Sequence, residues 1–293
     1  MQPPLALIPA RSERQAMDWS LVLVSQGIET IIERDSGTGH WGLVVSQPDY
    51  PRAVGALRQY CHENRHRVWR REVPGTGLIF DARALVWIVV LVFVYALDDA
   101  SGGRLREHGL MDSAAIYDGA WWRLFTATQL HGDLVHLATN ATTGFLLLGL
   151  VMGAFGTGWG LLAAFLAGVG GNLAGLVLLP ETHRSLGASG MVMGALGILT
   201  GESVAVLREG VAPRRVIGRA LAGGFLLLVL WGFSPDPRTD VVAHVGGFLG
   251  GIAIGGVMSW LPAGWLRSVR LNLLAGAAVA ALVTVTWWLA LRR

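Results

Sequence analysis

The sequence predicts a polytopic α-helical membrane protein of about seven transmembrane helices, with a small soluble α+β domain at its N-terminus. Of the 293 residues, 53% are hydrophobic and only 15% are charged, whereas soluble proteins average about 25% charged residues. After position 83 the apolar residues gather in blocks of roughly 20, the length needed to cross about 30 Å of hydrocarbon. Before that point, charges interrupt the apolar residues throughout. Most of the chain is therefore expected to lie in lipid.

The basic balance of the chain reflects membrane topology. The net charge is +3 and the pI is near 9.6, values that would also suit a nucleic-acid binder. Every basic residue is an arginine, however, and many lie in short loops between apolar blocks, which is the pattern of the positive-inside rule. We expect no nucleic-acid partner. Cys61 is the single cysteine, so an intrachain disulfide is excluded.

Residues 1–72 are expected to form the soluble module, in the order α-β-β-α. Ser12 and Gln15 have the spacing of a capping box, and Gly27 follows as a stop signal. The apolar face of this first helix is predicted to carry Met17, Leu21 and Val24. Residues 1–10 lack a cationic start and a long apolar run, so a cleaved signal peptide is not expected.

Two short β-prone runs, 28–34 and 40–46, flank a loop rich in Gly and Ser and predict a hairpin. A second helix is expected from Asp49 and Pro51 onward. Residues 73–82 then form a linker to the first apolar block.

Seven apolar blocks predict seven spans, at 83–98, 134–153, 158–179, 188–207, 216–233, 240–261 and 271–291. The first six form a core over 83–261, and 262–293 adds a seventh helix. Arginines cluster before span one, between spans four and five, and before span seven. These three segments lie on one side, which predicts a cytoplasmic N-terminus. The long segment 98–133 is expected to be an extracytoplasmic loop partly embedded in the membrane.

Three spans begin with polar residues, which are costly in lipid and mark candidate function. Span two begins near His136 and Asn140, which are four residues apart and share a helical face. Span four begins at Ser189, and span six begins near His244. In this topology all three spans run inward from the outer side, so the polar groups lie at one depth. A serine, a histidine base and oxyanion donors are the groups needed for acyl transfer.

Glycines give a physical reason why the serine and the histidine meet. Gly247, Gly251 and Gly255 lie on the face of span six that carries His244. Span four has a matching small-residue stripe made of Gly190, Gly194, Gly197 and Gly201. Small residues let helix backbones approach closely.

These blocks resemble the rhomboid intramembrane protease family over about residues 115–260. The match consists of Trp122-Arg123, His131 with His136 and Asn140, Gly187-x-Ser189-Gly190, and Ala243-His244 with Gly247 and Gly251. The resemblance implies a Ser189–His244 dyad without a carboxylate, and an oxyanion hole made by His136, Asn140 and the Ser189 N–H. It also implies a structural role for Arg123 and His131 in the long first loop. Substrates would be transmembrane segments of single-span proteins, cleaved at a site that opens to the extracytoplasmic side of a plasma (inner) membrane.

Family members often carry an aromatic residue where this chain has Met193, and methionine can fill the same volume beside an imidazole. Asp133 could be imagined as a third triad member, but nothing in the sequence brings it near His244. No HExxH-type spacing is present, so we expect neither a metal nor another cofactor.

Two alternative functions stay open, an inactive rhomboid-like binding or quality-control protein and, less favoured, a transporter. The sequence leaves the oligomeric state undetermined.

Overall fold

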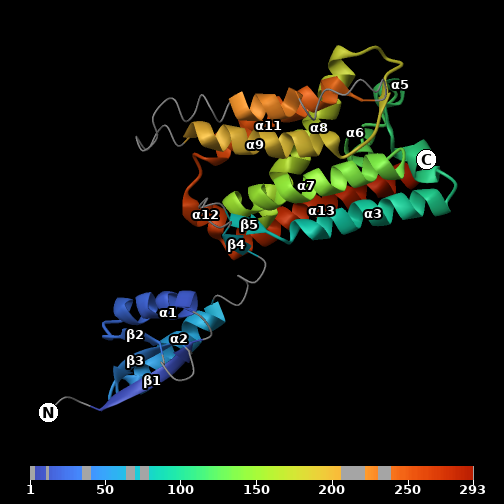
Figure 1. Ribbon diagram of the computed structural model, residues 1–293. Helices are drawn as coiled ribbons and strands as arrows, with labels where there is room; N and C mark the ends of the chain where they lie inside the picture. The colour runs from blue at the N-terminus through green and yellow to red at the C-terminus, as the bar shows by residue number, and fades with distance from the viewer. Residues whose placement is uncertain are drawn as a thin grey trace. The chain divides into compact units, whose positions relative to one another are not determined.

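The computed structural model describes residues 4–10, 13–34, 41–63, 70–72, 79–205, 222–229 and 239–292 (Figure 1). The chain divides into two compact units, Met1–Val68 and Trp69–Arg293. The sequence predicted this division at residue 72, with a linker over 73–82. The structure differs because β4 (Arg70–Glu72) pairs with β5 (Ile79–Asp81) as an antiparallel ribbon of the second unit. Part of the expected linker is thus a strand.

The N-terminal unit is a three-stranded antiparallel sheet with two helices (Figure 1). Its elements are β1 (Leu5–Ala10), α1 (Glu13–Ser25), β2 (Ile31–Arg34), β3 (Trp41–Ser46) and α2 (Tyr50–Glu63). The sheet order is β1-β3-β2. Ile8 and Leu43, which are register partners, join Leu23 of α1 and Leu57 of α2 in one hydrophobic cluster. The hairpin and both helices were predicted.

The first strand was missed, so the order is β-α-β-β-α and the predicted α-β-β-α is wrong. Strand β1 pairs with β3 along its whole length. Pro9 argued against a strand at this position, because proline cannot donate to a sheet ladder. It is tolerated here because β1 lies at the edge of the sheet. Alternate residues Ile8 and Ala10 are buried while Leu7 and Pro9 are exposed, as the period of two in a strand requires.

The predicted buried face of α1 is also wrong. Met17, Leu21 and Val24 are exposed, Leu21 by 70%. The helix instead buries Ala16 and Leu23. Both sets have helical spacing, so periodicity alone could not separate them. The expected cap at Ser12 lies outside the described residues.

The second unit is helical apart from short strands. Its elements after β5 are α3 (Ala84–Ala100), α4 (Arg104–Gly109), β6 (Met111–Asp112), α5 (Ser113–Tyr117), α6 (Arg123–Thr126), the 3₁₀ turn η2 (Ala127–Gln129), α7 (Leu134–Phe155), α8 (Thr157–Leu178), β7 (Arg184–Ser185), α9 (Ser189–Ala205), a helical segment 222–229, α11 (Val241–Met258), α12 (Ala263–Arg267) and α13 (Val269–Arg292). Strand β6 pairs with β7 and so joins the long first loop to the loop between α8 and α9.

Within the described residues, α7, α8, α11 and α13 are the four helices long and apolar enough to cross a membrane. The protein is therefore a multi-pass membrane protein. Helices α3 and α9 have 17 residues each and coincide with predicted spans one and four. Predicted span five, 216–233, lies outside the described residues except for the helical segment 222–229. The count of seven stays a prediction.

Helices α9 and α11 lie side by side, and α8 packs against both of them (Figure 1). Helix α7 packs against α3, α8 and α9, and α13 packs against α8. The main hydrophobic cluster of this unit draws residues from several of these helices, among them Trp87 of α3, Phe165 of α8 and Phe248 of α11. This packing brings the N-terminal ends of α7, α9 and α11 into one region.

Candidate active site

The three polar positions noted in the sequence all lie at the start of a helix. Ser189 is the first residue of α9, and His244 is in the first turn of α11. His136 and Asn140 occupy the first two turns of α7. Asn140 and His244 are buried, whereas Ser189 and His136 are half-buried. Since α9 packs against both α7 and α11, these groups gather around the head of α9.

Gly187 shows how closely two of them converge. Its φ of +135° lies in the region that favours glycine. A Cβ added there would lie 2.8 Å from both Cε1 and Nε2 of His136, and 3.7 Å from Oγ of Ser189. A side chain at Gly187 would therefore clash with the histidine ring, and the serine hydroxyl lies close to the same position. Gly187 was predicted only as a supporting residue of the motif.

The expected close approach of α9 and α11 is observed. A Cβ on Gly247 would collide with the carbonyl group of Gly190, and one on Gly251 with that of Gly194. At the head of the pair, a Cβ on Gly190 would lie 3.5 Å from the carbonyl oxygen of Ala243. The space between the residue after Ser189 and the residue before His244 is thus about one methyl group wide. The starts of the two helices therefore lie close together.

Carboxylates cap the two histidine-bearing helices. Asp133 Oδ1 accepts the N–H of His136 at 2.8 Å, and Asp240 Oδ1 accepts the N–H of Ala243 at 2.9 Å. Both are N-caps, which satisfy backbone donors that have no partner within the helix. Asp133 therefore orders the first turn of α7, and Asn140 adds a bond from Nδ2 to the carbonyl of His136 at 3.1 Å.

Sequence reasoning missed the second partner of Asp240. Its Oδ2 lies 3.0 Å from Nε2 of His183, in the loop between α8 and α9. The backbone carbonyl of Asp240 also accepts the N–H of His244 at 3.1 Å. One residue thus ties the α8–α9 loop to the first turn of the helix that carries the candidate base. The capping position could have been read from the sequence, but a partner 57 residues away leaves no local signal.

The first loop is fixed by its own polar residues. Arg123 donates to the carbonyls of Leu110 at 2.9 Å and Glu107 at 3.0 Å. His131 is only 1% exposed, and its ring lies edge-on to that of His136 with centroids 5.1 Å apart. Burial, with His136 adding to the effect, lowers the pKa of His131 to about 3. At neutral pH this imidazole is therefore uncharged.

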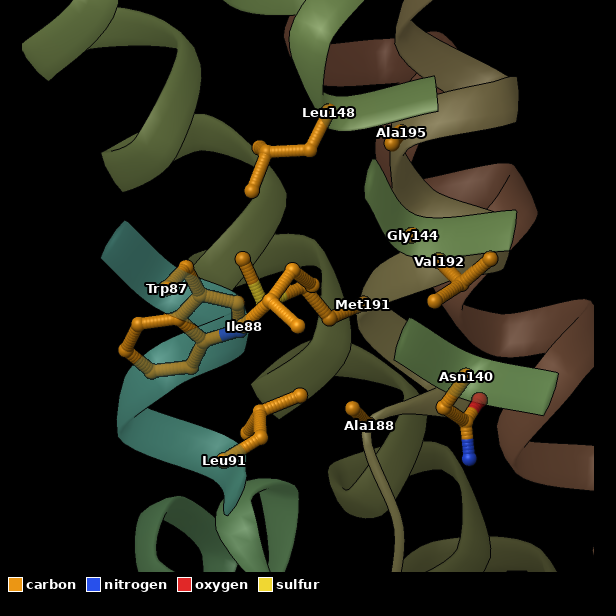
Figure 2. Close-up of a pocket in the computed structure, with 10 residues that line it drawn as sticks. All are labelled: Trp87, Ile88, Leu91, Asn140, Gly144, Leu148, Ala188, Met191, Val192 and Ala195. Atoms are coloured by element: carbon orange, nitrogen blue, oxygen red, sulfur yellow. The ribbon is translucent and has the colours of Figure 1, made fainter. Parts of the chain in front are cut away.

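A small apolar pocket adjoins the candidate site. It is lined from α3, α7, α9 and the turn before α9 (Figure 2). Trp87 and Leu91 form one side, Met191 faces them, and Asn140 lies at its edge next to the turn before α9. Met193 is also buried, at 3% exposure. Among the described residues no group of three or more His, Cys, Asp or Glu side chains is arranged to hold a metal ion.

Comparisons with known proteins show which family the chain resembles. The family model "Rhomboid domain" matches residues 118–261. The chain is 29% identical over 175 residues to rhomboid protease GluP of Bacillus subtilis (strain 168). This match covers 57% of this chain and 32% of that protein. It is 31% identical over 195 residues to the chloroplastic rhomboid-like protein 11 of Arabidopsis thaliana, covering 62% of this chain and 67% of the relative. Over 198 residues it is 28% identical to rhomboid-like protease 3 of Toxoplasma gondii, covering 64% and 73%. The chain spans about a third of the length of GluP and about half of the length of rhomboid-like proteins 6 and 5 of Arabidopsis thaliana.

Proposed function

The chain belongs to the rhomboid family, and from that premise we propose that it is an intramembrane serine endopeptidase with a Ser189–His244 dyad. A serine hydroxyl is a weak nucleophile unless a base takes its proton. In the proposed reaction, Oγ of Ser189 bonds to the scissile carbonyl carbon while His244 accepts the proton. The same imidazole then protonates the leaving amine, and water releases the acyl group from the serine.

The observation that carries this proposal is the backbone contact between the heads of α9 and α11. The carbonyl oxygen of Gly190, the residue after Ser189, lies so close to Gly247, three residues after His244, that a Cβ there would be only 2.2 Å from it. A helix-packing serine would need no such approach at a polar helix start. The packing supports a shared proton between side chains that reach only a few ångströms from their backbones.

For the developing oxyanion we propose three donors, namely His136, the Asn140 amide and the N–H of Ser189. The first four N–H groups of a helix have no acceptor within it, and the helix dipole makes that end favourable for negative charge. Ser189 is the first residue of α9, which supports its N–H in this role. The approach of His136 to Gly187 and Ser189 supports the imidazole as a second donor.

The same proposal includes the substrates of the protease and the membrane in which it lies. The expected substrates are single-span membrane proteins whose helix unwinds near the outer boundary of the bilayer, since a carbonyl within a helix is already hydrogen bonded. The arginine distribution supports a cytoplasmic N-terminus and a site that opens outward in the plasma (inner) membrane of a cell. Trp122, Arg123 and His131 are proposed to support the site through the first loop, and Met193 to pack beside His244.

Labelling with a fluorophosphonate probe tests the nucleophile directly. The purified protein should form a covalent adduct at Ser189, because an activated serine oxygen displaces fluoride from the probe and becomes phosphonylated. Ser189→Ala should abolish the adduct, and His244→Ala should slow its formation by at least about 10²-fold, the lower range for removing a general base. Folded wild-type protein that stays unlabelled would instead favour a binding protein or a transporter.

A further inference from the structure

The C-terminal helix α13 lies beyond the matched family domain, yet it is fixed to the rest of the unit near both of its ends. Near its start, Oδ1 of Asn272 accepts the backbone N–H of Gly158 at 3.0 Å, at the first turn of α8. Nδ2 of the same residue donates to the carbonyls of Leu266 at 2.6 Å and Ser268 at 3.0 Å. A Cβ on Gly158 would collide with the Asn272 carbonyl. The register of α13 along α8 is therefore set.

Near its other end, α13 makes a polar contact with the first loop. The indole Nε1 of Trp287 donates to Oε1 of Gln129 at 2.9 Å. Gln129 is fully buried, so its amide oxygen depends on protein donors. The Trp287 ring also covers Gly109, where a Cβ would lie 2.7 Å from Cη2 of the indole. Ring and hydrogen bond together fix one position of the indole.

Gln129 belongs to η2, the turn that leads directly to the candidate site. Its Nε2 donates to the carbonyl of Phe125 at 2.8 Å and also contacts Oγ1 of Thr128. Two residues earlier in the same turn, the carbonyl of Ala127 accepts the N–H of Gly187 at 2.9 Å. Gly187 in turn lies against His136 and Ser189. A short series of contacts thus connects an indole on α13 with the nucleophile turn.

We propose that Trp287 is a positioning residue for acyl transfer, acting through Gln129 on the turn that holds Gly187. This inference rests on the proposed function. Helix α13 would then be part of the catalytic unit, although it lies outside the matched domain. Without the indole N–H, the buried amide of Gln129 lacks a donor, and η2 gains freedom to rotate toward another partner. Catalytic groups are sensitive to such movement, since a misplacement of about 1 Å can lower the rate about 10²-fold.

The test replaces the indole with a ring that cannot donate, Trp287→Phe. The matched control is Trp288→Phe on the same helix, where the indole is 50% exposed and stacks under Arg292 at 3.7 Å. The cleavage of a single-span membrane protein is measured in proteoliposomes, well below the unfolding temperature. Trp287→Phe should lower kcat for this cleavage about tenfold, because the catalytic groups are partly misplaced, and it should leave KM within about twofold. Amide hydrogen exchange at Gly187 should become faster. Trp288→Phe should match the wild type in both measurements.

A double variant separates positioning from general loss of packing. Gln129→Met removes the acceptor together with the other bonds of this amide, so adding Trp287→Phe should lower kcat no further than Gln129→Met alone. Additive losses, an equal effect of Trp288→Phe, or wild-type kcat and exchange in Trp287→Phe would each overturn the inference. If wild-type protein takes up no fluorophosphonate, the proposed protease function fails. Exchange at Gly187 still decides in that case whether Trp287 orders the turn.

Discussion

The N-terminal unit and the α9–α11 pair are held together in different ways. The core of the N-terminal unit consists of side chains, among them Leu23, Leu43 and Leu57. Between α9 and α11 the backbones themselves touch, at positions such as Gly194 and Gly251. Water drives apolar side chains together in the first region. Lipid offers no such drive, so close van der Waals packing decides the second. The first region should therefore respond to lost volume, and the second to added volume.

Removal of side-chain volume from the N-terminal core should have the largest effect on stability. Leu23 is fully buried, and Leu23→Ala should destabilise this unit by about 2–5 kcal/mol, because it loses burial and leaves a cavity. Leu21→Ala, on the same helix at 70% exposure, should change stability by less than about 0.5 kcal/mol. Hydrogen exchange over residues 13–63 of the full chain measures both. If the two variants behave alike, the assignment of the buried face is wrong.

Addition of a single methyl group should have the next largest effect, in the other region. A Cβ on Gly251 would collide with Gly194, whereas one on Gly256 of the same helix meets nothing within 4 Å. Gly251→Ala should therefore destabilise the membrane unit by about 1–3 kcal/mol and slow the labelling of Ser189. Gly256→Ala should be neutral or slightly stabilising, since alanine favours a helix. Thermal unfolding in detergent, with labelling rates, makes the comparison. Equal rates for both variants would contradict the proposed role of the backbone contact.

The same contrast explains which features could be predicted from the sequence. The helix stripes of Gly190 and Gly247 were predicted, because helical spacing is a local property and glycine has one steric consequence at an interface. The buried face of α1 was not, since Met17 and Ala16 begin equally periodic stripes. Strand β1 was missed because only its place at the sheet edge makes Pro9 acceptable.

The polar pairs around the candidate site were missed for a related reason. His183 with Asp240 and Trp287 with Gln129 join residues that are 57 and 158 positions apart. Each partner alone has an ordinary explanation in the sequence, as a loop residue or an interfacial aromatic. Motif order predicted Ser189 and His244 as the dyad, whereas the residues that orient a site come from tertiary packing.

Lowering the pH should produce the smallest difference in stability between the two regions. The described residues of the N-terminal unit bury a wholly hydrophobic cluster, whereas the membrane unit buries His131 with a pKa lowered to about 3. Well above pH 6.5 this imidazole is neutral whether the chain is folded or not, so it has no influence on stability there. Between pH 6.5 and 3 only the unfolded chain takes up the proton. The membrane unit should therefore lose up to about 1.4 kcal/mol per pH unit as the pH falls.

Thermal unfolding of the membrane unit at pH 7.5, 6.5 and 5.5 measures this slope, with exchange over residues 13–63 as the internal reference. Stability should fall by about 0.4 kcal/mol between the first two values and by about 1 kcal/mol between the last two. Asparagine is uncharged at every pH, so His131→Asn should flatten the dependence of stability on pH, even if the variant is less stable throughout. An unchanged slope in that variant would mean that another group takes up the proton, and that His131 is not the reason for the acid sensitivity of the site region.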